Sequence, residues 1–566
     1  MRVRRNGLSA LATAVAAGLL AASAAAPVAS GEVPGRTEAV YSTSSPITAV
    51  VSSKVTLTVP LPAGTPSHPA ACDTLSYLRW RSADGPRSAA DADRVLVAQP
   101  GIFEGAGAFD SVARNTVSRA AELGKYIEFW ALDRRSNCLE DHTGLRSALR
   151  TGSLDTATGY YFHGAEVDGR RFGGFAEGEA TAWLREQGIA QTLRDEYEVL
   201  RIEFPDQAVR KQKVMCGGHS LGGFITGYFA EWDFDGDPGT LDDAGYNQCS
   251  AYFALDTTIQ AGLSLRGLQV PELPEPIGGS AENLSLQLDT ALPVLRLPAV
   301  INPETTNLLA LAGLAARLRP EGVNDLVRRL PENANITATL RTLLSQDAAM
   351  FATGYPDVRQ LNATNEAVLG AILDDNSQPL GFLQASVGFP SGGPVGPKTF
   401  PVPDAVGLSP LAMGMFGDAP KAAPTVYNQN TVYRWLDYDD TAELTAGPYT
   451  GPASEVTAIA ELARSLCEPP LDFTEWYFPT RLALDVQQTS APSFAHHHRH
   501  LDGVNRNPIL TFRGSGGIPV ADSGSPQDEV IHLPGYNHLD VLTAAPRQNN
   551  GQPEVVSSRL AEFAIG

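Results

Sequence analysis

The stretch Lys213–Gly223, KVMCGGHSLGG, decides the fold of this chain. A short apolar run leads into Gly-His-Ser-Leu-Gly, and apolar residues recur at helical spacing immediately afterwards. The pattern predicts a strand, a sharp turn with Ser220 at its apex, and a helix. Such a turn forces unusual backbone angles at the serine and packs its neighbours against the strand and the helix. Glycine is therefore needed at Gly218 and Gly222.

This segment resembles the nucleophile elbow of the α/β-hydrolase family, and GHSLGG resembles its lipase-like members. The resemblance implies that Ser220 is the nucleophile and that the backbone N–H of Leu221, at the helix start, faces an oxyanion. It also implies that neither a metal nor an organic cofactor is required. The alternative is a glycine-rich turn with a solvated serine, since Gly-x-Ser-x-Gly arises by chance in a chain with 53 Gly.

The elements around the elbow predict an alternating α/β chain with a mostly parallel sheet flanked by helices. We expect strands at residues 55–59, 73–81, 94–98, 126–132, 251–255, 508–512 and 529–533. We expect helices at residues 111–123, 175–204 and 555–564. Residues 31–50 are rich in Ser, Thr and Pro and are expected to be flexible.

The composition changes between about residues 260 and 500. Proline-rich segments there alternate with leucine-rich helical patterns at residues 307–318, 323–330, 337–344 and 456–466. We therefore expect an α/β-hydrolase core at residues 31–259 and 501–566, interrupted by a large, mainly helical cap at residues 260–500.

The N-terminus predicts export. Arg2, Arg4 and Arg5 precede an Ala/Leu-rich apolar run at residues 8–22, which has the length of a signal peptide and is too short to span a bilayer comfortably. We expect residues 1–30 to be removed and the mature protein to be secreted. The net charge of −21 argues against nucleic acid and anionic lipid as partners. The expected partner is a small-molecule or lipid ester, and the oligomeric state stays open.

Five cysteines in an exported chain permit two disulfides and one thiol. Cys216 lies in the strand before the elbow, so we expect it to be the buried thiol. Cys72, Cys138, Cys249 and Cys467 then allow three connectivities, among which the sequence does not choose.

The base that activates the serine is expected to follow the last strand. His538 lies there, in a turn with Gly535 and Asn537, where the family places its histidine. A neutral imidazole at His538 accepts the Ser220 proton and later donates it to the leaving alcohol. His532 competes for this role, but it falls within the predicted strand.

The acid has two candidates. The family usually places it after the penultimate strand, where this chain has RGSGG at residues 513–517, and Asp522 lies a little further on. Asp256 ends the strand that follows the elbow strand, the position used by a subset of lipases, and we prefer it. Its alternative role is a helix N-cap before Thr257. Loss of the acid would leave a non-catalytic secreted binding protein, which the glycine-rich stretch keeps open.

The family's second oxyanion donor lies in the loop after the strand at residues 94–98, often as His-Gly-x. The corresponding segment here is Pro100-Gly101-Ile102. The resemblance implies that the Ile102 N–H is the donor and that Gly101 permits the close approach. An ordinary strand-to-helix loop is the alternative.

Two further clusters invite a metal interpretation. Residues 233–243 begin like a calcium loop, but Pro238 and Ala244 stand where such a loop has Gly and Glu, so we expect an acidic surface turn. The histidines at residues 496–500 are expected to lie in a flexible loop.

Together these features predict a secreted serine hydrolase that cleaves carboxylic esters with an apolar acyl group. The predicted triad is Ser220, His538 and Asp256, and the reaction passes through an acyl-enzyme. A peptidase and an acyltransferase use the same arrangement and remain alternatives.

Overall fold

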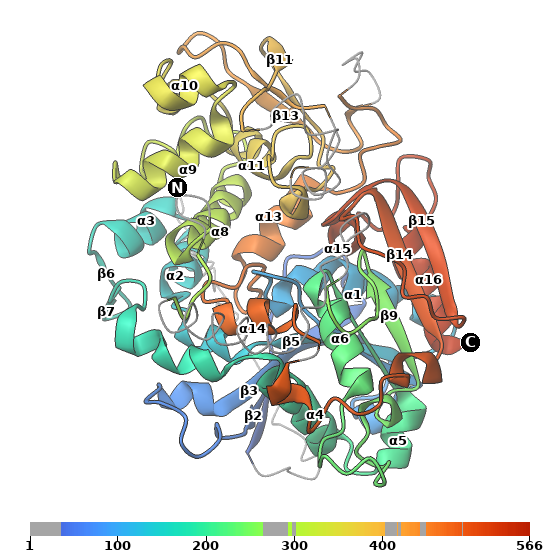
Figure 1. Ribbon diagram of the computed structural model, residues 1–566. Helices are drawn as coiled ribbons and strands as arrows, with labels where there is room; N and C mark the ends of the chain where they lie inside the picture. The colour runs from blue at the N-terminus through green and yellow to red at the C-terminus, as the bar shows by residue number, and fades with distance from the viewer. Residues whose placement is uncertain are drawn as a thin grey trace, which may run out of the picture. The chain divides into compact units, whose positions relative to one another are not determined.

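A nine-stranded sheet organises the protein, in the order β1-β2-β3-β5-β4-β8-β9-β14-β15 (Figure 1). Its strands are β1 (Arg36–Val40), β2 (Val50–Thr58), β3 (Thr74–Ser82), β4 (Arg94–Gln99), β5 (Ile127–Asp133), β8 (Val214–His219), β9 (Ala251–Leu255), β14 (Ile509–Gly516) and β15 (Asp528–Asn537). Strands β1, β2 and β3 pair antiparallel with their neighbours. From β5 to β15 every pairing is parallel. The predicted class, a mostly parallel sheet flanked by helices, is confirmed.

The computed structural model describes residues 35–263, 292–296, 301–401, 416, 420–441, 449–489 and 491–566. The predicted signal peptide therefore lies outside the described residues, as do parts of the predicted cap. Residues 35–566 cluster as one unit.

Helices cover both faces of the sheet. The core helices are α1 (Asp110–Glu122), α4 (Ile189–Glu203), α5 (Gln207–Lys213), α6 (Leu221–Glu231), α15 (Asp540–Thr543) and α16 (Val555–Ile565). On β4, Val95 and Val97 join the apolar core beneath α4 and α6, while Leu96 and Ala98 join the core beneath α1 and α16. Because both faces are covered, β4 is a continuous apolar run rather than an alternating one.

The predicted strands are all present, with ends displaced by a few residues. The prediction for residues 31–50 was wrong at residues 36–40, which form the edge strand β1. The long helix predicted at residues 175–204 was also wrong. It is divided into a 3₁₀ segment, Gly178–Glu186, and α4. The break falls at Gly188, where a Cβ would lie 2.1 Å from Asp485 Oδ2, and the same carboxylate accepts the Ile189 N–H at 3.0 Å.

Between β5 and α4 lie α2 (Thr143–Thr151), α3 (Leu154–Phe162) and the short strands β6 (Glu166–Val167) and β7 (Arg170–Arg171). Between β9 and β14 lie α8 (Pro303–Leu318), α9 (Ala334–Leu344), α10 (Ala348–Thr353), α11 (Asn365–Leu373), β10 (Phe389–Ser391), β11 (Val395–Pro397), β12 (Ala422–Pro424), β13 (Arg434–Leu436), α13 (Ile459–Cys467) and α14 (Thr480–Asp485). The helix predicted at residues 323–330 was wrong. That segment consists of turns, and Asn324 has φ +56°. The boundaries of core and cap stay predictions.

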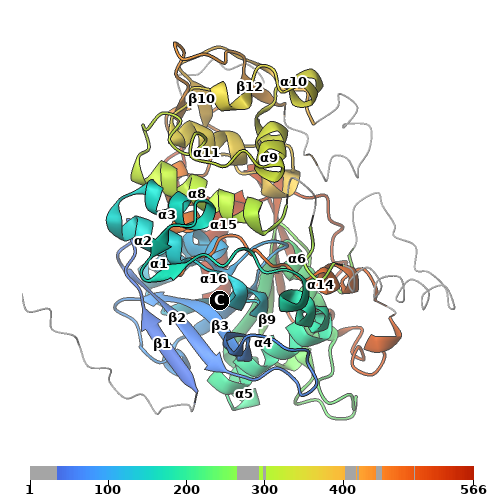
Figure 2. The same cartoon turned by 90° about the vertical axis from the view of Figure 1, so that its left-hand side faces the viewer.

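The segment between β9 and β14 contacts the loops at the carboxyl ends of the parallel strands. Glu475 N–H donates to Phe103 O at 2.9 Å, beyond the end of β4. Leu539 N–H donates to Gln384 O at 3.0 Å, beyond the end of β15. Figures 1 and 2 show α8, α9 and α11 above the sheet in both views.

The expectation that Cys216 is the free thiol was wrong. Cys216 in β8 is bonded to Cys249, with Cα atoms 5.8 Å apart, and Cys72 is bonded to Cys138. Cys467 is the free, buried cysteine. The physical reason is the pairing of β8 with β9, which brings the segment entering β9 alongside Cys216.

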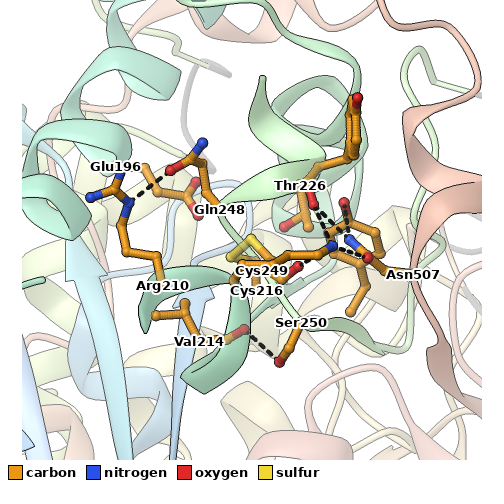
Figure 3. The surroundings of a disulfide bond; sticks show 12 residues. Glu196, Arg210, Val214, Cys216, Thr226, Gln248, Cys249, Ser250 and Asn507 are labelled. Atoms are coloured by element: carbon orange, nitrogen blue, oxygen red, sulfur yellow. Dashed lines mark hydrogen bonds between the residues drawn. A yellow bond between two sulfur atoms is a disulfide. The ribbon is translucent and has the colours of Figure 1, made fainter. Parts of the chain in front are cut away.

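Figure 3 shows the polar contacts that hold this entry segment. Ser250 Oγ donates to Val214 O at 2.8 Å, and Arg210 Nε donates to Gln248 Oε1 at 2.7 Å. The disulfide therefore links β8 to the segment before β9, which these hydrogen bonds also hold in place.

We predict that mapping the peptides of the non-reduced protein will recover Cys216 with Cys249 and Cys72 with Cys138. A single thiol, Cys467, will alkylate only after denaturation, because it is fully buried. Removing the disulfide with the double variant Cys216→Ala/Cys249→Ala is expected to cost about 3–4 kcal/mol in the free energy of unfolding, from the entropy of its closed loop. Cys467→Ala is the control, and alkylation of Cys216 in the native oxidised protein would contradict the pairing.

Candidate active site

Ser220 occupies a strained turn between β8 and α6, as the sequence predicted. Its backbone angles are φ +53° and ψ −121°. The turn is packed so closely against β4 that a Cβ at Gly222 would lie 2.0 Å from Gln99 O, and one at Gly218 would lie 2.5 Å from the same oxygen. Both glycines are thus required by the contact with β4.

Non-glycine residues with positive φ are concentrated around Ser220. Five non-glycine residues in the described part of the chain have positive φ, and three of them, Phe103, Ser220 and Asp256, lie at the carboxyl ends of β4, β8 and β9. Backbone strain of this kind costs about 1–3 kcal/mol for each residue and is typical of functional sites.

The structure brings the predicted base and the preferred acid together. Asp256 directly follows β9, and His538 directly follows β15. His538 Nδ1 lies 2.6 Å from Asp256 Oδ2, and both side chains are buried. The Ser220 N–H donates to Leu255 O, directly before Asp256, at 3.3 Å, because the carboxyl ends of parallel strands share one edge of the sheet.

The glycine-rich stretch after β14 surrounds the Asp256 carboxylate. Gly514 N–H donates to Oδ1 at 2.9 Å, and Ile518 N–H donates to Oδ2 at 3.0 Å. A Cβ at Gly517 would lie 2.2 Å from both carboxylate oxygens. The glycines that replace an acid at this position therefore make room for an acid delivered by another strand.

The other two candidates lie elsewhere. The Asp522 side chain is 58% exposed and lies 3.7 Å from Arg513. His532 is exposed on the edge strand β15. The structure places neither of them with Ser220.

The loop predicted to supply the second oxyanion donor packs directly against the serine. A Cβ at Gly101 would lie 2.9 Å from Ser220 Cβ. Arg134 Nη2 fixes the loop by donating to Pro100 O and, at 3.0 Å, to Gly101 O. The Ile102 N–H makes no hydrogen bond to any residue that the structure describes.

The second predicted donor begins a helix. Leu221 is the first residue of α6, so its N–H has no acceptor within that helix. The roles of Ile102 and Leu221 at an oxyanion stay predictions.

Comparison with known proteins gives distant structural similarity alone. No protein-family model and no curated protein matches this sequence. The peroxisomal α/β-hydrolase Lpx1 of Saccharomyces cerevisiae is 13% identical, with 92% of this chain and 90% of that chain covered and a TM-score of 0.32. The epoxide hydrolase VrEH1 of Vigna radiata is 10% identical, with 86% and 94% covered and a TM-score of 0.30. A soluble variant of monoglyceride lipase from Saccharomyces cerevisiae is 10% identical, with 87% and 91% covered and a TM-score of 0.24.

The fold follows from the mostly parallel sheet with helices on both faces and the serine at the elbow after β8. This chain has the α/β-hydrolase fold.

Two further residues of this α/β-hydrolase fold reach the site and were missed in the sequence. His219 precedes the serine, and its Nδ1 lies 2.7 Å from Glu104 Oε1 while its Nε2 lies 2.9 Å from His538 O. Glu104 Oε2 accepts the Gly101 N–H at 2.7 Å. The signal in the sequence was their position, since His219 directly precedes Ser220 and Glu104 lies shortly after Ile102. The sequence could not show that the two side chains meet, because they are far apart in the chain.

The buried charges influence one another. Burial and the adjacent His219 lower the pKa of His538, against the opposing effects of Asp256 and Glu104. Burial disfavours a charged His219, but the Glu104 carboxylate raises the pKa of His219 above its ordinary value. Burial likewise disfavours a charged Glu104, yet His219 holds the pKa of Glu104 below its ordinary value.

One group of acidic side chains in the described part of the chain has metal-ligand spacing. Carboxylate oxygens of Asp233, Asp235 and Asp243 lie within 4.8 Å of one another. Two of these carboxylates hold the turn itself, since Asp233 accepts the Gly236 N–H at 2.7 Å and Asp243 accepts the Asp235 N–H at 2.6 Å. The acidic surface turn stays a prediction.

The nearby histidines are individually paired. His500 Nε2 lies 3.0 Å from Asp233 Oδ2, and His498 Nε2 lies 2.6 Å from Glu231 Oε2. The histidines of residues 496–500 therefore do not converge on one ion.

The close approach at Gly517 generates a test of the acid. We predict that Gly517→Ala will displace the Asp256 carboxylate and slow the reaction of Ser220 with a fluorophosphonate by about 100-fold, the cost of a misplacement of about 1 Å. Circular dichroism should show an unchanged fold. Gly173→Ala is the matched control, because a Cβ there meets nothing within 4 Å. Equal rates in the two variants would exclude Asp256 as the orienting acid.

Proposed function

We propose that the protein is a secreted serine hydrolase that cleaves carboxylic esters with an apolar acyl group, using Ser220, His538 and Asp256. The observation that carries this proposal is the buried contact between His538 Nδ1 and Asp256 Oδ2, 2.6 Å long, next to a serine held at positive φ. A serine hydroxyl needs a neighbouring base to become nucleophilic, and that base needs a third group to orient it.

The chemistry proceeds by acyl transfer. With its Nδ1–H donated to Asp256, the neutral His538 ring has its lone pair on Nε2, where it accepts the Ser220 proton as Oγ attacks the ester carbonyl carbon. The resulting imidazolium is stabilised by Asp256. It then protonates the departing alcohol oxygen, which leaves Ser220 acylated. In the second half, His538 takes a proton from water as the water oxygen adds to the acyl carbon. The bond from that carbon to Ser220 Oγ then breaks, the imidazolium returns its proton to Oγ, and the acid is released.

The tetrahedral oxyanion of each half-reaction is assigned to the N–H groups of Ile102 and Leu221. Loss of one such donor typically reduces the rate about 100- to 1000-fold. Arg134 and Glu104 support this assignment, because they bind the carbonyl and the N–H of Gly101, directly before Ile102.

An apolar cavity beside the oxyanion loop supports an apolar acyl group. It is narrow, with a volume of about 40 Å³. Phe103, which directly follows Ile102, lines it together with residues of α8, α9 and α11 and of the neighbouring loops, namely Ile301, Thr305, Thr306, Leu308, Leu309, Thr339, Thr342, Leu343, Ile372, Gln378, Leu380, Leu383 and Thr474. Phe103 thus joins one wall of the cavity to the loop assigned to the oxyanion, which supports an apolar acyl group.

The threonines in this lining act as apolar residues. The hydroxyls of Thr339 and Thr342 donate to the carbonyls of residues 335 and 338, one helical turn earlier. Those of Thr305, Thr306 and Thr474 also donate to main-chain carbonyls. With the hydroxyl groups engaged in this way, the side chains present methyl groups, and an acyl chain meets an apolar wall.

Export is supported by the two disulfides, which persist in oxidising compartments. Among the helices that the structure describes, none combines the length and the apolar character needed to cross a bilayer.

The first test is labelling with a fluorophosphonate probe. We expect wild type to label and Ser220→Ala and His538→Ala to lose labelling, because the nucleophile or its base is gone. Asp256→Asn should lower the labelling rate by at least about 1000-fold, since the imidazole loses the anion that orients it. Asp522→Asn is the matched control and should label like wild type. A folded wild type that does not label would contradict the hydrolase proposal and favour a non-catalytic binding protein.

The second test concerns the cavity. We predict that Leu309→Trp, on the cavity wall, will lower kcat/KM for a p-nitrophenyl ester with a long acyl chain about tenfold or more and leave the acetate ester unchanged, because the indole shortens the cavity. Leu241→Trp is the control, since that side chain is 47% exposed. Equal effects on both esters would place the acyl group elsewhere. Analysis of the products on ester and peptide substrates, with and without added alcohol, separates hydrolase, peptidase and acyltransferase.

A further inference from the structure

His219 is fully buried and has an oxygen atom facing each of its ring nitrogens. Nδ1 lies 2.7 Å from Glu104 Oε1, and Nε2 lies 2.9 Å from the main-chain oxygen of His538. A carbonyl oxygen only accepts hydrogen bonds, so Nε2 must carry a hydrogen. Nδ1 is buried and meets the Glu104 carboxylate at ion-pair distance without the alignment of a hydrogen bond, so an ionised Glu104 favours a charged ring through electrostatic attraction. The arrangement then holds an imidazolium beside a carboxylate.

We propose that Glu104 and His219 form a buried ion pair that positions His538 and keeps it neutral at acidic pH, so that both are positioning residues of the site. This inference rests on the proposed function. It goes beyond the triad because Glu104 and His219 contact other residues of the site and are not assigned a contact with the ester. Their effect passes through His538 and through the loop at Gly101.

The positional part of the role lies in the hydrogen bonds. The His219 Nε2–H donates to the main chain of His538, so the residue next to the nucleophile fixes the backbone of the base. Glu104 Oε2 accepts the Gly101 N–H at 2.7 Å, so the same carboxylate fixes the loop that carries Ile102. One ion pair thus connects the ends of β4, β8 and β15.

The electrostatic effect of the ion pair on His538 arises because the rings of His219 and His538 are close, with centroids 4.3 Å apart. Among the residues that the structure describes, the charged groups with the largest effect on His538 are Asp256 after β9, His219 at the end of β8 and Glu104 after β4. The two carboxylates raise the pKa of His538, while burial and the His219 cation lower it, and the net direction is downward. A base must be neutral to accept a proton, so a lowered pKa extends activity to lower pH.

The isosteric variant Glu104→Gln separates charge from geometry. The glutamine carbonyl oxygen accepts the Gly101 N–H, its NH₂ faces His219 Nδ1, and a neutral His219 still donates from Nε2 to His538. The hydrogen bonds to Gly101 and to the His538 main chain are kept while both charges disappear. We expect the acidic limb of kcat/KM to move to higher pH than in wild type, because burial still lowers the pKa of His538 but the lowering effect of the His219 cation is gone. Above pH 8, kcat/KM should stay within about threefold of wild type.

Glu104→Ala serves as the contrasting variant. It removes the hydrogen bonds as well as the charge, so we expect a loss of about 100-fold at every pH through misplacement of the loop and the base. An unmoved acidic limb in Glu104→Gln, with the alkaline rate retained, would overturn the ion-pair proposal and reduce Glu104 to a hydrogen-bonding role.

A readout without turnover keeps this test independent of the proposed function. In protein labelled with ¹⁵N-histidine, the resonances of His219 are assigned by their loss in His219→Asn. Both His219 nitrogens should show the shifts of a protonated ring at pH 7 in wild type, and one should become unprotonated in Glu104→Gln. A neutral His219 in wild type overturns the inference even if the protein labels with fluorophosphonate. A protonated His219 in a protein that does not label sustains the ion pair and rejects only the hydrolase.

Discussion

The contact between the elbow and β4 is the constraint on which the site depends. Gln99 O lies so close to Gly218 and Gly222 that neither position has room for a Cβ. This contact turns the chain sharply between β8 and α6 and holds Ser220 at φ +53°. Since β4 and β9 flank β8 in a parallel sheet, the loops that follow all three strands open at the same edge. The loop at Gly101 and Ile102, Ser220 and Asp256 therefore lie at one edge of the sheet.

Burial strengthens the electrostatic interactions among the polar groups at this edge of the sheet and also raises the free-energy cost of leaving any of them without a partner. Glu104, His219, Asp256 and His538 are each at most 6% exposed. A buried charge without partners is strongly destabilising, so each carboxylate here is surrounded by donors. Asp256 receives two main-chain N–H groups besides His538, and Glu104 receives Gly101 besides His219. The same low-dielectric surroundings make the protonation of one histidine dependent on the charge of the other.

The predictions made from sequence succeeded where the signal was local. The apolar run and glycine spacing of KVMCGGHSLGG specified strand, turn and helix, and the ends of predicted strands located His538 and Asp256. They failed where a distant residue intervened. Asp485 divides the predicted helix at Gly188, and the pairing of β8 with β9 brings Cys249 to Cys216. The preference for Asp256 over Asp522 rested on resemblance and stays a prediction, while the structure shows that Asp256 contacts His538 and that Asp522 is exposed.

The sequence by itself determined the order of strands and helices, the elbow with Ser220, and the strand ends on which His538 and Asp256 lie, because hydrophobic periodicity and glycine spacing act over a few neighbouring residues. Only the tertiary structure decided which side chains meet. The contacts of Glu104 with His219, of Gly517 with Asp256 and of Cys216 with Cys249 join segments far apart in the chain. Such contacts depend on strand order and register, which become defined when the whole sheet packs against its helices and buries both faces.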